Sequence, residues 1–178
     1  AVDLTLTAEA KAALEGQGTF LLERATVHFH NDAEWHIGVK SRFIDVTATG
    51  YTPDHQLLFS NRMRWQNGTL QDIALAASNG GIAGAILQAV IGVGCTAEFN
   101  NTGIRLDGCD FEQSTVLCSN LAPHSWVASC SFFGGGENLP QLDVSGSTSN
   151  LFLEGNRFEN HAIGLRLLQA QTTASCNS

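Results

Sequence analysis

A short internal repeat limits what this chain can fold into more than any other feature of its sequence. The unit has an apolar residue, a variable one, a small one, a small one or Asn, a polar one and a final apolar residue. Its copies align without gaps and read WQNGTL (65–70), LDGCDF (106–111), VASCSF (127–132) and LEGNRF (153–158). The final residues lie at 70, 111, 132 and 158, so the first step, of 41 residues, corresponds to two periods of about twenty.

A second series of apolar triplets follows the first in the same order, at residues 116–118, 142–144 and 165–167. Two interleaved series mean that each repeat contributes several short strands. Such a unit buries its apolar face only by stacking on its neighbours, which indicates a solenoid whose strands pair in parallel at about 4.8 Å. Equivalent residues would then form columns. We predict an internal ladder of Leu70, Phe111, Phe132 and Phe158, and a corner column of Gly68, Cys109, Cys130 and Asn156, which tolerate a left-handed backbone or point inward without bulk.

The alternative is a β-sandwich. From Thr19 onward the apolar pieces are short and separated by Gly, Asn, Ser and Asp, which is typical of any all-β domain. The Asn67-Gly68 and Asn79-Gly80 pairs would also suit tight hairpin turns. A sandwich gives no reason for like residues to recur in columns, so we prefer the solenoid.

The segments LEGNRFEN, LDGCDFEQ and NNTGIRL give residues 60–170 a resemblance to the right-handed parallel β-helix family, as in pectate-lyase-like enzymes and phage tailspikes. The expected fold is therefore all-β, a single-stranded right-handed parallel β-helix of about six coils. The motifs are specific to the architecture and not to one activity.

The first residues differ from the rest of the chain. Residues 7–15 contain good helix formers, with Thr7 as a possible N-cap and Gly16 as a stop, which predicts a short helix. The resemblance implies that this helix caps the N-terminal end of the stack. We expect one domain over residues 1–178, with residues 1–18 as the cap segment and residues 19–178 as the coils.

Composition narrows the function classes. The formal net charge is −8, and the nine Lys and Arg residues are not clustered in the sequence, so we predict no nucleic-acid partner. The longest nearly apolar run, residues 82–93, is shorter than the ~20 residues that span a bilayer, so we predict no membrane span. The five Cys residues show no C-x-x-C spacing and are interpreted as small buried hydrophobes, although disulfides and reactivity stay open.

An acidic pair could carry catalysis. If Leu106 and Leu153 point inward, Asp107 and Glu154 point outward two coils apart, about 9.6 Å by strand spacing. That separation is close to the upper end of the carboxylate spacing in inverting glycosidases, about 6.5–9.5 Å. We expect the neighbouring outward residues Asp110 and Arg157 to assist. The alternative is that these charges only keep the outer face soluble.

The densest polar cluster contains His28, His30, Asp32 and His36. His28 and His30 share one face of a strand, a spacing that zinc sites use. The same pattern is common on edge strands, so we predict no metal and no cofactor.

Exposed aromatic rings are the other sign of carbohydrate binding. Trp65 occupies the inward apolar position of its repeat and is expected in the core. Trp35 and Trp126 are the two residues that we expect to be exposed and to bind carbohydrate, Trp35 because it lies in an acidic segment and Trp126 because it adjoins the inward Val127.

Three function classes remain. The preferred one is a structural or receptor-binding part of a phage tailspike or fibre that recognises surface polysaccharide, because no established catalytic motif is present. The alternatives are a glycoside hydrolase or polysaccharide lyase, and a secreted adhesion β-helix. An uncovered sheet end favours association, so we expect a homo-oligomer, a trimer as in phage spikes, located outside the cell or on the virion surface.

Overall fold

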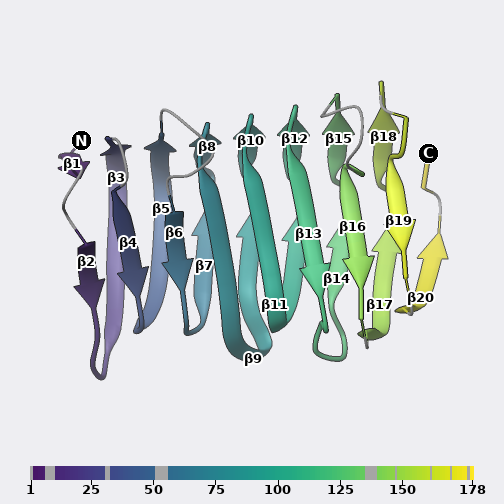
Figure 1. Ribbon diagram of the computed structural model, residues 1–178, viewed down its shortest axis with the longest axis horizontal. Helices are drawn as coiled ribbons and strands as arrows, with labels where there is room; N and C mark the ends of the chain where they lie inside the picture. Colours follow the sequence, from purple (N-terminus) through teal and green to yellow (C-terminus); the bar gives the residue numbers. More distant parts are fainter. Residues whose placement is uncertain are drawn as a thin grey trace.

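The computed structural model describes residues 2–6, 11–30, 33–50, 56–134, 140–146, 148–160, 162–168, 170–175 and 177–178. These residues form a parallel β-solenoid, which confirms the predicted all-β coil. Figure 1 shows the strands side by side along one axis, with the N-terminus at one end of the stack and the C-terminus at the other. The 20 strands form one hydrogen-bonded network, and every pairing is parallel between neighbouring coils.

The pairings fall into three groups, which we name sheets A, B and C. Sheet A contains β2 (Lys11–Leu14), β4 (Glu34–Ile37), β6 (Gln56–Phe59), the first part of β9 (Ala74–Gln88), the first part of β11 (Thr96–Asp107), β13 (Thr115–Ser119), β16 (Leu142–Ser145) and β19 (Leu165–Leu167). Sheet B contains the first parts of β3 (Thr19–Phe29) and β5 (Lys40–Thr49), then β7 (Met63–Gln66), the last parts of β9 and β11, β14 (Trp126–Ala128), β17 (Thr148–Glu154) and β20 (Ala170–Ser175). Sheet C contains β1 (Val2–Leu6), the last parts of β3 and β5, β8 (Thr69–Gln71), β10 (Ile91–Val93), β12 (Asp110–Glu112), β15 (Ser131–Phe133) and β18 (Arg157–Glu159).

The predicted internal ladder is present in sheet C. Leu70, Phe111, Phe132 and Phe158 lie in one column, with Gly92 as the member from the coil between Leu70 and Phe111. The ring centroids of Phe111 and Phe132 are 5.4 Å apart, and those of Phe132 and Phe158 are 4.9 Å apart, with nearly parallel planes. The 41-residue step therefore spans two coils, as the sequence predicts.

The predicted corner column lies where sheet B turns into sheet C. At this corner the residue before each column member has a positive φ, for example 50° at Asn67, 59° at Gly108 and 54° at Ser129. The left-handed turn aims the next side chain into the core, so Cys109, Cys130 and Asn156 are buried there. The buried Asn156 amide donates to Val127 O at 2.8 Å and accepts from the backbone N–H of Cys130 at 3.0 Å, which satisfies its polar atoms.

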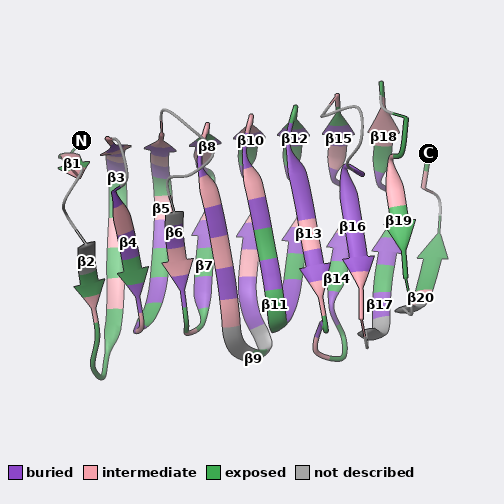
Figure 2. Cartoon of the chain, viewed as in Figure 1, coloured by how far each residue is buried: buried purple, intermediate pink, exposed green. Residues whose placement is uncertain are grey.

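Buried residues alternate with intermediate or exposed ones along many of the strands, as Figure 2 shows. The core is a continuous column of apolar residues from Ala25 to Leu153, and it includes Cys95, Cys109, Cys118 and Cys130 as unpaired thiols. Burial raises the pKa of the Cys118 and Cys95 thiols. These four cysteines thus act as small hydrophobes, as predicted, while Cys176 lies outside the described residues.

The prediction of an N-terminal helix over residues 7–15 is wrong for the part of this segment that the structure describes. Residues 11–14 form β2, which pairs in parallel with β4, and Leu14 O accepts a hydrogen bond from Gly38 N at 2.8 Å. Leu14 also packs against the core. A helix this short has little stability of its own, so strand pairing and burial outweigh the helix propensity of its residues. Residues 7–10 lie outside the described part of the chain.

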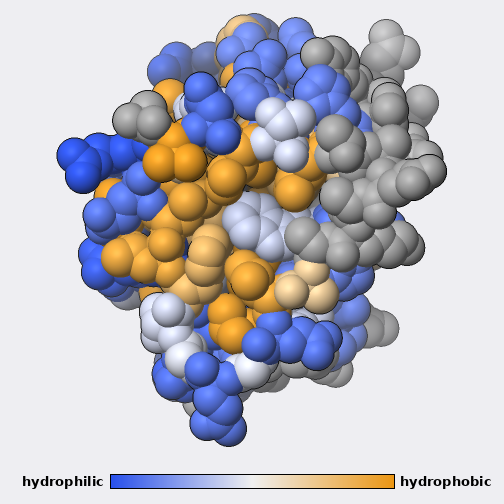
Figure 3. All heavy atoms as spheres, turned by 90° about the vertical axis from the view of Figure 1, so that its left-hand side faces the viewer, coloured by the Kyte–Doolittle hydropathy of each residue, from blue (hydrophilic) through white to orange (hydrophobic). Residues whose placement is uncertain are grey.

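The N-terminal end of the stack is apolar. A cavity of about 480 Å³ opens there, and Leu4, Leu6, Leu14, Phe20, Leu22 and Trp35 contribute to its lining. Figure 3 views this end and shows apolar atoms gathered at its centre with polar atoms around them.

The phenylalanine ladder depends on the absence of a side chain at Gly92. A Cβ at this position would lie 2.8 Å from Cδ1 of Phe111 and 2.8 Å from Sγ of Cys95. We expect Gly92→Ala to lower the free energy of unfolding by about 1–3 kcal/mol, measured by urea denaturation. In a Phe111→Leu background the same change should cost less, and an equal cost in both backgrounds would contradict this account of the ladder.

Candidate functional site

The outer face of sheet B holds three of the six predicted site residues, Asp107, Trp126 and Glu154. Leu106, Val127 and Leu153 are buried in consecutive coils, so the residues on either side of each point outward. The result is a grid with two rows. One row contains Arg105, Trp126 and Phe152, and the other contains Asp107, Ala128 and Glu154.

The predicted carboxylate pair has the predicted register. Asp107 pairs with Ala128, and Ala128 pairs with Glu154, so the two acids lie two strands apart, about 9.6 Å along the sheet. Arg105 Nη2 lies 3.3 Å from Asp107 Oδ2, and the Asp107 side chain is 33% exposed. Glu154 is exposed on the same face. Ala128, which lies between the two acids, has only a methyl side chain.

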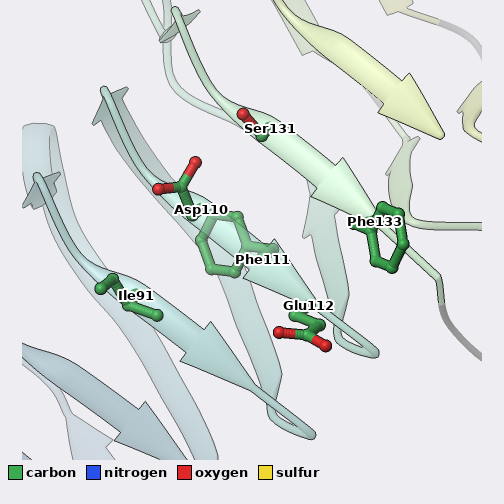
Figure 4. A pocket seen from close by; sticks show the side chains of 6 residues that line it. All are labelled: Ile91, Asp110, Phe111, Glu112, Ser131 and Phe133. Carbon is green, nitrogen blue, oxygen red and sulfur yellow. The ribbon is translucent and has the colours of Figure 1, made fainter.

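Asp110 and Arg157 do not join this pair. They lie around the corner, on the outer face of sheet C, in one column with Ser131 between them. Arg157 forms an ion pair with Glu159. Figure 4 shows Asp110 and Glu112 on β12 beside a cavity of about 280 Å³ that Ile91, Ser131 and Phe133 also line. The four residues predicted to act in catalysis are therefore divided between two faces.

An exposed aromatic pair occupies the sheet-B grid. Trp126 is 42% exposed and Phe152 is 37% exposed, and their ring centroids are 6.1 Å apart. The guanidinium carbon of Arg105 lies 6.0 Å from the Trp126 ring centroid, within the range of a cation–π contact. The exposure predicted for Trp126 is confirmed. Phe152 was missed by the sequence analysis, although its position before the inward Leu153 matches that of Trp126 before Val127.

The exposure expected for Trp35 is wrong. Trp35 is only 7% exposed and makes edge contacts with Phe20, at 5.6 Å between centroids, and with Phe43, at 6.2 Å. It lies on β4 in register with the buried Leu57, so strand alternation turns it into the core. The acidic neighbour Glu34 precedes Trp35 on β4, so strand alternation turns it to the opposite side, and it did not indicate the environment of Trp35.

The histidine cluster is divided between sheets. His28 lies in the sheet-C part of β3, where its Nδ1 is 2.8 Å from Thr49 Oγ1, and His36 lies on β4 of sheet A, where its Nε2 is 3.0 Å from Glu34 Oε2. Asp32 is outside the described residues. Among the residues that the structure describes, no three His, Cys, Asp or Glu side chains are grouped as metal ligands would be.

The Lys and Arg residues that are not clustered in the sequence are clustered in space, which corrects the expectation of dispersed cations. Arg42 on β5 pairs with Arg64 on β7, and the preceding residues Lys40 and Arg62 flank the adjoining pair Ser41 and Met63. All four side chains are exposed on the outer face of sheet B. Arg105 lies on the same face, two strands beyond Arg64. Strands of neighbouring coils pair in parallel and in register. Charges that are about one coil length apart in the sequence therefore come together.

Comparison with protein-family models, curated proteins and solved structures finds no match to this chain. Within the described ranges, no helix has the length and apolar character needed to cross a membrane.

The three tryptophans offer a direct test of this face. Trp65 is fully buried, Trp35 nearly so, and only Trp126 is substantially exposed. We expect acrylamide to quench mainly the fluorescence of Trp126, so that Trp126→Phe removes the accessible component. Trp35→Phe should leave that component in place. An accessible fraction that survives in Trp126→Phe would contradict the placement of Trp126 on the surface.

Proposed function

We propose that this protein is a β-helix of the phage tailspike or fibre type, a structural and receptor-binding part that recognises surface polysaccharide through the outer face of sheet B. The observation that carries the proposal is the exposed pair of Trp126 and Phe152 on a rigid sheet, with Asp107, Glu154 and Arg105 beside it. We further propose the right-handed form of the coil, since parallel crossover connections are right-handed in nearly all proteins.

The chemistry of this grid suits a sugar polymer. Aromatic faces offer a flat apolar surface to the C–H face of a sugar ring, and an exposed pair in adjacent coils offers two such surfaces along one line. The carboxylates of Asp107 and Glu154 accept hydrogen bonds from hydroxyl groups, and the Arg105 guanidinium donates them. Because all of these side chains project from paired strands, their spacing is fixed before a ligand arrives, which lowers the entropy lost on binding.

A polysaccharide-cleaving enzyme is the second candidate, and the register of Asp107, Ala128 and Glu154 favours it. Against it, a general acid is usually kept protonated by an enclosed apolar environment, whereas these two acids project from the outer side of a sheet. Asp110 and Arg157 lie on the neighbouring face, so they would not reach a substrate held between Asp107 and Glu154. A secreted adhesion β-helix with the same binding face is the third candidate. In each case the protein would act outside the cell or on a virion surface.

Trp126→Ala should weaken binding to those polysaccharides that the native chain binds on a glycan array. Loss of one stacking surface costs about 1.5 kcal/mol, so we expect about a tenfold rise in Kd. Phe133→Ala is the matched control, because Phe133 is an equally exposed aromatic residue, at 43%, on sheet C. Equal losses in both variants would contradict a site on sheet B. Reducing-end and unsaturated-uronate assays on the same glycans test the enzyme, and cleavage that is lost in Asp107→Asn would favour it over the binding protein.

The proposed spike also requires self-association. The apolar N-terminal end, with its cavity of about 480 Å³, supports a chain that does not remain alone in solution. We expect light scattering to give three times the 19.0 kDa mass of the chain. A monomer at high protein concentration would remove the trimer and weaken the spike interpretation, while leaving the binding face untouched.

A further inference from the structure

The cationic cluster on sheet B is more than a solvated surface. Five of the nine Lys and Arg residues of an acidic chain lie on this one face. They are Lys40, Arg42, Arg62, Arg64 and Arg105. Arg42 and Arg64 are direct cross-strand partners, about 4.8 Å apart at their backbones. Like charges placed directly opposite each other destabilise a sheet, so folding alone gives no reason for this arrangement.

Neutral acceptors hold the two central guanidinium groups. Arg42 donates to Gln66 Oε1 at 3.2 Å, and Arg64 donates to Gln88 Oε1 at 3.3 Å. The Gln66 amide in turn donates to Gln88 Oε1 at 3.0 Å, which forms a short amide ladder beside the arginines. Amides orient the guanidinium groups without neutralising them.

The four cations Lys40, Arg42, Arg62 and Arg64 are outside the ion pairs that the described residues form. In the described part of the chain, the recorded ion pairs involve His36, Arg105, Arg157 and Arg166, and none involves Lys40, Arg42, Arg62 or Arg64. A protein with a net charge of −8 thus keeps a patch of four cations outside its ion pairs, on the same face as its aromatic pair. Anionic groups are the ligands that such a patch attracts, and Arg binds carboxylate and sulfate-like oxyanions with two parallel hydrogen bonds.

We propose that the outer face of sheet B binds an anionic polysaccharide, one bearing carboxylate or sulfate groups, whose chain runs along the solenoid axis. This inference rests on the proposed function and specifies its ligand. Acid groups of the polymer lie on the patch of Lys40, Arg42, Arg62 and Arg64, and sugar rings lie on Trp126 and Phe152. Arg105 lies between the two halves, because it follows Arg64 and Ile86 in one column and also contacts the Trp126 ring.

A nucleic acid would also be attracted to arginines and aromatic rings. The observation that favours a polysaccharide is the row beside the aromatic pair, where Asp107 and Glu154 flank Ala128. These carboxylates would repel a continuous phosphate backbone that reaches the rings, whereas they accept hydrogen bonds from sugar hydroxyls. A polymer with both acid groups and free hydroxyls matches both halves of the face.

The test compares polygalacturonate and dextran sulfate with neutral dextran and a single-stranded oligothymidylate, each titrated into the full chain by calorimetry. We expect binding to at least one of the two acidic polysaccharides, none to neutral dextran, and affinity that falls as salt rises from about 50 to about 200 mM. Arg42→Gln with Arg64→Gln should weaken that binding about tenfold. Gln88→Glu, which adds a carboxylate beside Arg64 and changes the shape of the side chain very little, should weaken it in the same direction.

Arg24→Gln is the matched control, because it removes one positive charge at the corner between sheets B and C, away from the patch. It should leave the affinity unchanged. Equal binding by the double arginine variant, or a preference for the oligothymidylate, overturns the inference. If a neutral glycan binds through Trp126 and the arginine variants have no effect, the inference fails while the proposed function stands. If no saccharide of either charge binds, both fail.

Discussion

The in-register pairing of parallel strands is the constraint on which every other feature of this molecule depends. Each coil places its residues directly over those of the coil before, about one strand spacing away. Inside, this stacks Phe111, Phe132 and Phe158 with ring centroids 5.4 and 4.9 Å apart. A ladder of this kind tolerates little shift, since a slip by one residue would turn every apolar side chain outward. The core therefore fixes the register, and the register then fixes the surface.

The same rule builds the outer face from residues that are distant in the sequence. Lys40 and Arg42 meet Arg62 and Arg64 only because one coil separates them, and Trp126 meets Phe152 for the same reason. Since rigid strands carry these side chains, the face is organised before it meets a ligand. This distinguishes it from the sheet-C cavity beside Asp110, whose lining combines acidic side chains with Ile91 and Phe133 and has no cation among the residues that line it.

Sequence reasoning reached the architecture and part of the face. The phenylalanine column, the corner at Cys109 and Cys130 and the outward placement of Asp107 and Glu154 all followed from aligned repeats, because alignment is equivalent to register in a solenoid. The conformation and burial of residues outside a recognisable repeat were predicted less accurately. Residues 11–14 have helix-forming composition, but pairing with β4 decides their conformation, and Trp35 was judged by its acidic neighbours although strand alternation buries it. The cations were missed because Lys40 to Arg64 precede the clear repeats, so no register was available to bring them together.

One outward row of sheet B, which we call the acceptor row, explains how a single face combines cationic and acidic groups. Along sheet B it reads Gln66, Gln88, Asp107, Ala128 and Glu154, and the row beside it reads Arg64, Ile86, Arg105, Trp126 and Phe152 over the same coils. Arg42 and Arg64 donate to the neutral amides of Gln66 and Gln88, so their positive charge is retained. In the aromatic half the row holds Ala128 beside Trp126 and the Glu154 carboxylate beside Phe152, and this carboxylate gives hydroxyl groups a strong partner. Only Arg105 and Asp107, at the boundary between the two halves, neutralise each other, at 3.3 Å. A protein that needed only solubility would gain nothing from this separation, because alternating charges would serve it better. A polymer that lies along the axis, in contrast, would meet an acid-binding segment and then a ring-binding segment in a fixed order.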